Sequence, residues 1–291
     1  MKVLEYAKIL RFRINYLVVI FCAMFLARQF SIIPFLLVSI FSYSALFYGV
    51  MVNFANDYDS DSKNPPMKRY GHITGKIEFR KISRLSSLFL ILTIISGLSM
   101  AFIKNDLIFL LLTIIAIHCG FSYSSPPFRL KRFWWGGIVS YTLSTSVIFI
   151  ISVLAFGGAD RMIILLSVLV LWFGSLSVWS LSHISDRKFD KKTKIVTPAM
   201  KFSKRQLSFL YTIFIAVSSF FGIYVSMFLL GMWWSFIPFT VSFLVSVKPA
   251  VSILRENDMN RLRKKAHGPG VMPYRLNVIF LAIIYLLAFL A

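Results

Sequence analysis

The chain has 291 residues, of which 58% are hydrophobic and 15% are charged, and its formal net charge is +21. A soluble domain of this length could not bury so much apolar surface, so the composition excludes a water-soluble globular protein and indicates a polytopic membrane protein. The charge does not indicate nucleic-acid binding, because the basic residues are divided among short segments between apolar runs and do not form one folded, water-exposed face.

Nine apolar segments are long enough, or nearly so, to cross a bilayer. We expect them to be helices, because backbone amides in hydrocarbon must be satisfied within their own segment and these runs are too long and continuous for barrel strands. The expected fold class is therefore all-α integral membrane. The predicted spans lie near residues 15–30, 32–53, 85–103, 107–121, 137–156, 162–182, 207–227, 230–247 and 277–291.

The basic residues are sorted by side of the membrane. If the N-terminus lies in the cytosol, every Lys and Arg except Arg28, Lys104 and Arg161 falls in the N-terminal segment or in a cytosolic connection. This asymmetry predicts a cytosolic N-terminus and, after nine spans, a C-terminus on the outer side. In a prokaryote the membrane would be the plasma membrane.

No flexible linker or low-complexity segment divides the chain, so we expect a single membrane domain over residues 1–291. Two cytosolic loops of this domain, 57–84 and 186–206, are rich in Asp and also carry many basic residues. Each loop directly follows a predicted span, so their acidic residues lie at the edge of the bilayer.

The first acidic cluster, NFANDYDSD, places Asn53, Asp57 and Asp61 at i, i+4 and i+8, which is one face of a helix. The second, SDRKFD, places Asp186 and Asp190 at i and i+4. Side-chain oxygens favour Mg²⁺ or Ca²⁺ over zinc, and Mg²⁺ commonly completes its coordination with water and phosphate oxygens. Two oxygen rows facing one diphosphate would suit Mg²⁺.

Either cluster alone is better explained as the polar end of an ordinary span. Together, on the same predicted side and at matching depths, they favour a site, because acidic residues at the membrane edge are otherwise scarce in this chain. The Lys and Arg residues around both clusters would then hold the same anion. His118 is an ionisable residue inside the fourth predicted span, which makes it a candidate functional residue. A structural role, as a neutral histidine bonded to a neighbouring backbone carbonyl, is the favoured interpretation.

These motifs resemble those of the UbiA-type intramembrane prenyltransferases. NFANDYDSD fits the family pattern NxxxDxxxD, and DRKFDKKTKIVTPA fits DxxxD followed seven residues later by a threonine, Thr197. YSSPPFRLK fits a third signature through its tyrosine, both prolines, its arginine and its lysine. The three motifs occur in family order and cover nearly the whole chain.

The resemblance has three departures. Lys194 replaces a glycine expected four residues after Asp190, Lys68 and Arg69 replace an Arg-Pro pair, and His183 stands where an additional Asp or Asn is common. The acidic residues of both motifs are all present, so the resemblance still implies an active enzyme. A catalytically silent relative that binds a prenyl diphosphate without turnover remains an alternative because of Lys194.

The resemblance implies nine transmembrane helices bundled around a central cavity that opens to the cytosol. It also implies Mg²⁺-dependent transfer of a prenyl group from a polyprenyl diphosphate, such as geranylgeranyl diphosphate, to a lipophilic acceptor. The catalytic residues would be Asp57, Asp61, Asp186 and Asp190, which with Asn53 would be the metal ligands. The diphosphate would be bound by Asn53, Lys68, Tyr123, Arg129, Lys131 and Lys194.

The acceptor stays open among a quinone precursor, a carotenoid, a chlorin and an ether lipid. The alternative from another class is a transporter or a binding protein for anionic lipids, which would use the basic cytosolic loops. A carrier commonly has charged or broken helices at mid-membrane, and apart from His118 the predicted spans lack ionisable groups there. The expected partners are the two substrates and membrane lipid, with no nucleic acid; the oligomeric state is undetermined.

Overall fold

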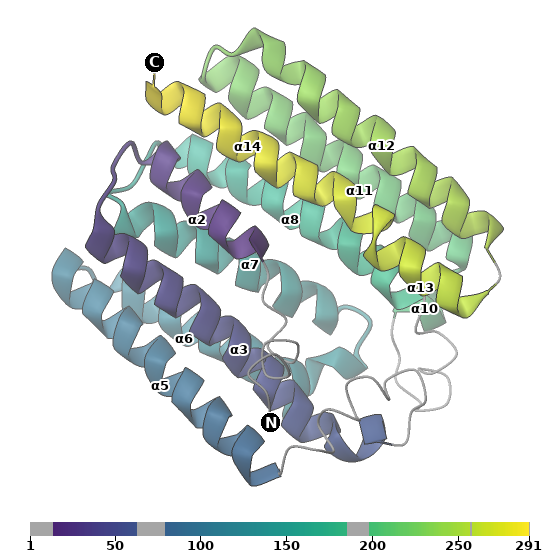
Figure 1. The fold of residues 1–291 in the computed structure, drawn as a ribbon, viewed down its shortest axis with the longest axis horizontal. Helices are drawn as coiled ribbons and strands as arrows, with labels where there is room; N and C mark the ends of the chain where they lie inside the picture. The colour runs from purple at the N-terminus through teal and green to yellow at the C-terminus, as the bar shows by residue number, and fades with distance from the viewer. Residues whose placement is uncertain (1–13, 63–78, 185–197, 257, 291) are drawn as a thin grey trace.

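The computed structural model describes residues 14–62, 79–184, 198–256 and 258–290. Over these ranges the regular structure is helical and contains no strand. The long helices run side by side and form one elongated bundle (Figure 1). The predicted all-α class is confirmed.

Each predicted span coincides with one long or apolar helix, and short helices occupy the connections. The nine apolar helices are α2 (Ile14–Leu26), α3 (Ile32–Ser62), α5 (Phe79–Lys104), α6 (Ile108–Ser124), α7 (Gly136–Ala155), α8 (Arg161–Ile184), α11 (Lys204–Tyr224), α12 (Phe236–Arg255) and α14 (Met272–Leu290). The short helices are η2 (Leu130–Arg132), α10 (Pro198–Lys201), η3 (Val225–Leu229), η4 (Trp233–Ser235), α13 (Met259–His267) and η5 (Pro269–Val271).

Within the described residues, seven helical segments are long and apolar enough to cross a bilayer, whereas the apolar segments Tyr16–Leu26 and Ile108–Ser124 are shorter. Large apolar side chains cover the outside of the bundle: Phe102 is 88% exposed and Ile114 is 63% exposed. Such a surface is stable only in contact with lipid. The protein is therefore an integral membrane protein, and a count of nine spans depends on α2 and α6.

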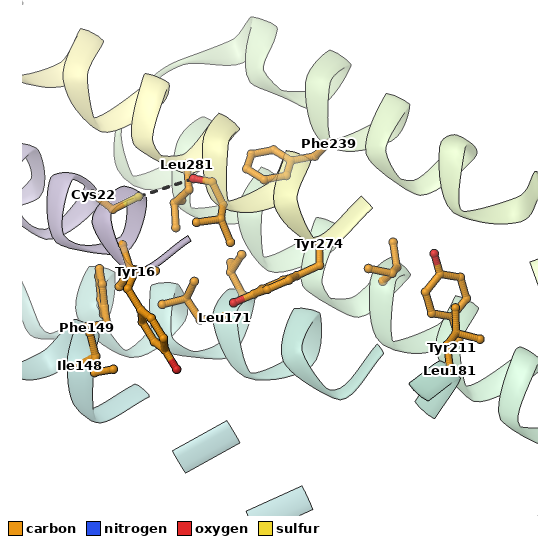
Figure 2. Close-up of a cluster of buried hydrophobic side chains, with 14 of the residues drawn as sticks. Tyr16, Cys22, Ile148, Phe149, Leu171, Leu181, Tyr211, Phe239, Tyr274 and Leu281 are labelled. Carbon is orange, nitrogen blue, oxygen red and sulfur yellow. Dashed lines mark hydrogen bonds between the residues drawn. The ribbon is translucent and has the colours of Figure 1, made fainter. Parts of the chain in front are cut away.

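The bundle has two apolar cores that share α2 and α7. The larger core joins these helices to α8, α11, α12 and α14, and includes the fully buried side chains of Tyr211, Phe239 and Leu281 (Figure 2). The smaller core joins them to α3, α5 and α6. Because α2 and α7 pack into both cores, they connect α3 and α6 on one side of the bundle to α12 and α14 on the other.

Buried hydroxyl and amide groups also connect the helices. Asn277 Nδ2 on α14 donates to Ser218 Oγ on α11 over 2.9 Å, and Ser218 Oγ donates to the carbonyl of Val170 on α8 over 2.8 Å. Lipid is as apolar as a leucine side chain, so helices in a membrane associate through close packing and hydrogen bonds of this kind.

One end of the bundle gathers several features that the sequence singled out. The C-terminal ends of α3, α6 and α8 lie there, together with η2, α10 and α13 (Figure 1). Helix α3 continues through Ser62, beyond the predicted end of its span, so Asp57 and Asp61 lie on the helix itself. The first acidic cluster is thus a helical extension of a membrane span.

Candidate functional site

A close crossing of α3 and α6 brings two motifs together. A Cβ atom added to Gly49 would lie 3.3 Å from the Cα of Gly120, and one added to Gly120 would lie 3.2 Å from the Cα of Gly49. Only residues without a side chain let two helix backbones approach so closely. One turn further along both helices, Ser124 Oγ donates to Asn53 Oδ1 over 2.5 Å. The glycine pair therefore sets the distance between the first acidic cluster and the YSSPPFRLK segment.

Two oxygens of α3 converge on a single cation from η2. Lys131 Nζ donates to Asn53 Oδ1 over 3.2 Å and forms a short ion pair with Asp57 Oδ2. The predicted i, i+4 spacing is thus confirmed for Asn53 and Asp57, which present their oxygens on one face. The Lys131 side chain is 11% exposed and that of Asp57 is 17% exposed. Partial burial strengthens the attraction between the charges, but it also makes either charge costly without its partner.

Arg129 adds a second positive charge beside the same carboxylate. Its Nη2 lies 3.9 Å from Asp57 Oδ1 and donates to the carbonyl of Asn56 over 3.3 Å. Its Nε is buried and has no hydrogen-bond partner within the described part of the chain. The backbone of Arg129 has a φ of 42°, in the left-handed region that non-glycine residues seldom occupy. Strain of this kind is concentrated at functional sites, and it aims the guanidinium at the end of α3.

The hydroxyl groups of Ser124 and Ser125 complete the contact between the two motifs, and the sequence analysis missed both. Ser124 bonds Asn53, and Asn56 Nδ2 donates to Ser125 Oγ over 3.0 Å. Both serines are buried. A signal existed, because they lie between the tyrosine and the first proline of the third motif, but their partners are about 70 residues away in the chain.

The beginning of α7 holds η2 in place. A Cβ atom at Gly136 would lie 2.1 Å from the carbonyl oxygen of Leu130, so this position requires glycine. A Cβ atom at Gly137 would lie 3.9 Å from the ring of Tyr123, which places that tyrosine beside the first turn of α7. The backbone of the segment that carries Lys131 is therefore packed directly against α7.

The remaining predicted site residues are described only in part. Asp61 lies on the last turn of α3, and the structure does not describe its side chain. Lys68, Asp186, Asp190 and Lys194 lie outside the described residues. The meeting of the two acidic clusters and the central cavity between them therefore stay predictions.

The two histidines singled out in the sequence pack against aromatic rings. His183, at the end of α8, lies 5.1 Å from Trp179 between ring centroids, and the two rings meet edge to face. His118 meets Phe128 in the same way at 5.3 Å. His183 therefore lies near the beginning of the second acidic cluster, whereas the ring contact of His118 is with the segment that follows α6.

The oxygen donors of α3 fit a divalent cation. A carboxylate and an amide oxygen on successive helical turns already surround the ammonium of Lys131, which shows that the two groups converge on one positive charge. Oxygen donors of this type favour Mg²⁺ or Ca²⁺. Among the described residues, no group of three or more His, Cys, Asp or Glu side chains could hold a metal ion. Asn53 and Asp57 would supply part of such a site.

Comparison with known proteins assigns the family. The sequence model of the UbiA prenyltransferase family matches residues 16–289, so the chain belongs to this family. No curated protein sequence matches the chain significantly.

Several solved structures have the same fold. A UbiA homologue from Archaeoglobus fulgidus bound to GPP and Mg²⁺ has a TM-score of 0.67 and 17% identity, with 94% of this chain and 99% of that chain covered. A UbiA homologue from Aeropyrum pernix K1 has a TM-score of 0.69 and 14% identity, with 95% of this chain and 96% of that chain covered. A digeranylgeranylglyceryl phosphate synthase has a TM-score of 0.65 and 17% identity, with 96% of each chain covered. At these identities the likeness establishes the fold.

The close crossing can be tested by adding volume to it. We expect Gly120→Val to force α3 and α6 apart and to lower the free energy of unfolding by about 1–3 kcal/mol, as overpacking does. The melting temperature of the purified protein in detergent measures this effect. Ile114→Trp adds bulk to the lipid-facing side of the same helix and should leave the melting temperature unchanged. Equal melting temperatures for the wild type and Gly120→Val would show that the crossing is not tight.

Proposed function

We propose that the protein is a Mg²⁺-dependent prenyltransferase that transfers a prenyl group from a polyprenyl diphosphate to a lipophilic acceptor. The observation that carries this proposal is the convergence of the α3 oxygens with Arg129 and Lys131 at one end of a membrane bundle. Membership of the UbiA family supports it, as does the GPP and Mg²⁺ bound in the Archaeoglobus fulgidus homologue.

The proposed reaction explains why cations and carboxylates are mixed in one site. Cleavage of the allylic C–O bond leaves negative charge on the departing diphosphate and positive charge on the prenyl carbon. Bound Mg²⁺ would neutralise the departing oxygens. The metal ligands would be Asn53, Asp57 and Asp61 on one side and Asp186 and Asp190 on the other. Mg²⁺ commonly takes only one or two protein carboxylates and fills its other positions with water and phosphate oxygens, so two separate clusters that face one diphosphate would suit it.

The basic residues of the candidate site would bind the diphosphate directly. The Nε of Arg129 is a buried donor without a protein acceptor among the described residues. A guanidinium suits a phosphate group because its N–H donors lie in one plane. The Lys131 side chain is flexible enough to move its ammonium from Asp57 to a phosphate oxygen. Lys68, Lys194 and the Tyr123 hydroxyl would complete the anion site.

The arrangement of charges disfavours a carrier. Along the described helices, charged residues lie within about two turns of a helix end, and none lies in the middle turns of a span. Carriers usually place charged or broken helices at mid-membrane. The acceptor in our proposal is therefore a lipid-soluble molecule that reaches the site from the bilayer, with a quinone precursor, a carotenoid, a chlorin and an ether lipid as the candidate classes.

Replacing the carboxylate in the described part of the site should abolish transfer. We expect Asp57→Asn to lower the rate of product formation from labelled geranylgeranyl diphosphate and a membrane lipid extract by about 10²–10³, as loss of one electrostatic stabiliser does. Asp160→Asn is the matched control, since Asp160 only caps α8 through the amides of Met162 and Ile163 and Asn caps a helix equally well. Wild-type rates in Asp57→Asn would refute the assigned role.

Removal of divalent cations should have the same effect as loss of the carboxylate. We expect EDTA to stop product formation and an excess of Mg²⁺ to restore it, because oxygen ligands release Mg²⁺ to a strong chelator. Calorimetric titration with geranylgeranyl thiodiphosphate, in the presence and absence of Mg²⁺, gives a second readout. Transfer that continues at full rate in EDTA would contradict the metal requirement.

We also propose the orientation in which the site faces the cytosol. In a Cys22→Ala, Cys119→Ala background, an impermeant maleimide added to intact cells should label an Asp106→Cys variant and not an Arg84→Cys variant. Both positions are exposed and lie at opposite ends of the bundle. Labelling of Arg84→Cys alone would reverse the proposed orientation.

A further inference from the structure

An open groove lies on the far side of the bundle from the candidate site. It is formed by α12 and α13 and has a volume of about 600 Å³. In Figure 1, α12 lies along the edge of the bundle opposite α3 and α5. The residues that line the groove are Leu244, Val247, Lys248, Val251, Ser252, Arg255 and Lys265.

Apolar and basic residues alternate along the α12 wall of the groove, and the last of them is Arg255. Leu244, Lys248, Val251 and Arg255 follow one another at helical spacing, so they form one stripe of the helix. Leu244 is 60% exposed and Val251 is 39% exposed, which makes this stripe part of the lipid-facing surface. The stripe ends at Arg255, in the last turn of α12. This turn lies at the same end of the bundle as the candidate site (Figure 1). The groove thus begins in hydrocarbon and ends at the membrane surface.

The basic end of the groove has an excess of positive charge. Lys265 Nζ on α13 donates to Glu256 Oε2 over 2.9 Å, which fixes its position beside the end of α12. The hydrogen bond from Lys265, with a second from the backbone N–H of Asp258, lowers the pKa of Glu256, so this carboxylate stays ionised. Lys248 and Arg255 form no ion pair with any described carboxylate. Of the three cations that line the groove, only Lys265 is paired with a described carboxylate.

The basic end is also held in a defined shape. Lys204 Nζ, from the beginning of α11, donates to the carbonyl of Leu254 over 3.0 Å and to that of Glu256. These bonds satisfy carbonyl groups at the C-terminal end of α12, which otherwise lack partners within the helix. Asp258 caps the first turn of α13 by accepting a bond from the amide of Arg261 over 2.8 Å. These bonds hold the end of α12 and the beginning of α13 at the basic end of the groove.

We propose that this groove binds one anionic phospholipid. Its phosphate lies among Lys248, Arg255 and Lys265, and an acyl chain contacts the apolar lining residues Leu244, Val247 and Val251 within the bilayer. Charge complementarity selects an anionic headgroup. The apolar residues of the wall select a lipid over a soluble phosphate, which would leave Leu244 and Val251 without a role. This inference is independent of the proposed transferase activity.

Binding of phosphatidylglycerol to the purified full-length protein tests the proposal. Native mass spectrometry counts bound lipids as phosphatidylglycerol or phosphatidylcholine is added. We expect the Lys248→Gln, Arg255→Gln double variant to bind phosphatidylglycerol about 30-fold more weakly than the wild type, at about fivefold for each charge lost. Phosphatidylcholine binding should not change. The matched control is Arg80→Gln, Arg84→Gln, which removes two exposed charges from the beginning of α5.

Two further arms distinguish a lipid from a soluble anion. A Leu244→Ser, Val251→Ser variant should also bind phosphatidylglycerol more weakly, and an excess of inorganic phosphate should not displace the lipid. Unchanged lipid binding in the Lys248→Gln, Arg255→Gln variant, or an equal loss in the control variant, would overturn the proposal. Displacement by inorganic phosphate would overturn it too. Melting temperatures of all variants report whether a loss of binding is a loss of folding.

Discussion

The site depends on the contact between α3 and α6. Gly49 and Gly120 let the two backbones approach, and the next turn of each helix then brings Asn53 against Ser124. Because η2 follows α6 directly and packs on the beginning of α7, the same contact places Lys131 over Asn53 and Asp57. In a bilayer no general hydrophobic force holds helices together, so a close crossing of small residues is an effective way to fix such distances. Every charge described in the site is positioned through it.

We propose that the site binds a charged group, because the described side chains do not satisfy one another completely. Acidic residues one turn apart on α3 repel one another, and the Asp57 side chain is only 17% exposed. Lys131 and Arg129 offset this repulsion, but Arg129 does so with a left-handed backbone and a buried Nε that has no partner in the described structure. An ion pair with a purely structural role would not need the left-handed backbone of Arg129 or its buried Nε without a partner. A diphosphate with bound Mg²⁺ would satisfy both the carboxylates and the spare donors, in keeping with membership of the UbiA prenyltransferase family.

The sequence predicted the helices and the shared face of Asn53 and Asp57 on α3, for identifiable reasons. Apolar length alone located the nine apolar helices of the described residues, and the i, i+4 spacing correctly placed the oxygens of Asn53 and Asp57 on one face. The end of α3 was placed too early, because hydropathy falls at Asn53 while the helix continues through Ser62. The contact of Ser124 with Asn53 could not be derived, since it joins residues 71 positions apart and depends on where Gly49 meets Gly120. The opposing cluster, Asp186 and Asp190, remains a prediction.

The central claim is that the end of α3 and the segment from Arg129 to Lys131 form one half of a Mg²⁺–diphosphate site, which Asp186 and Asp190 complete. An experimental structure with Mg²⁺ and geranylgeranyl thiodiphosphate tests it most directly. The account predicts diphosphate density in contact with Arg129 and Lys131, with a metal ion bound by Asp57 and the second acidic cluster facing it. Diphosphate bound elsewhere, or Asp186 and Asp190 turned away from Asp57 with no shared ligand, would contradict it.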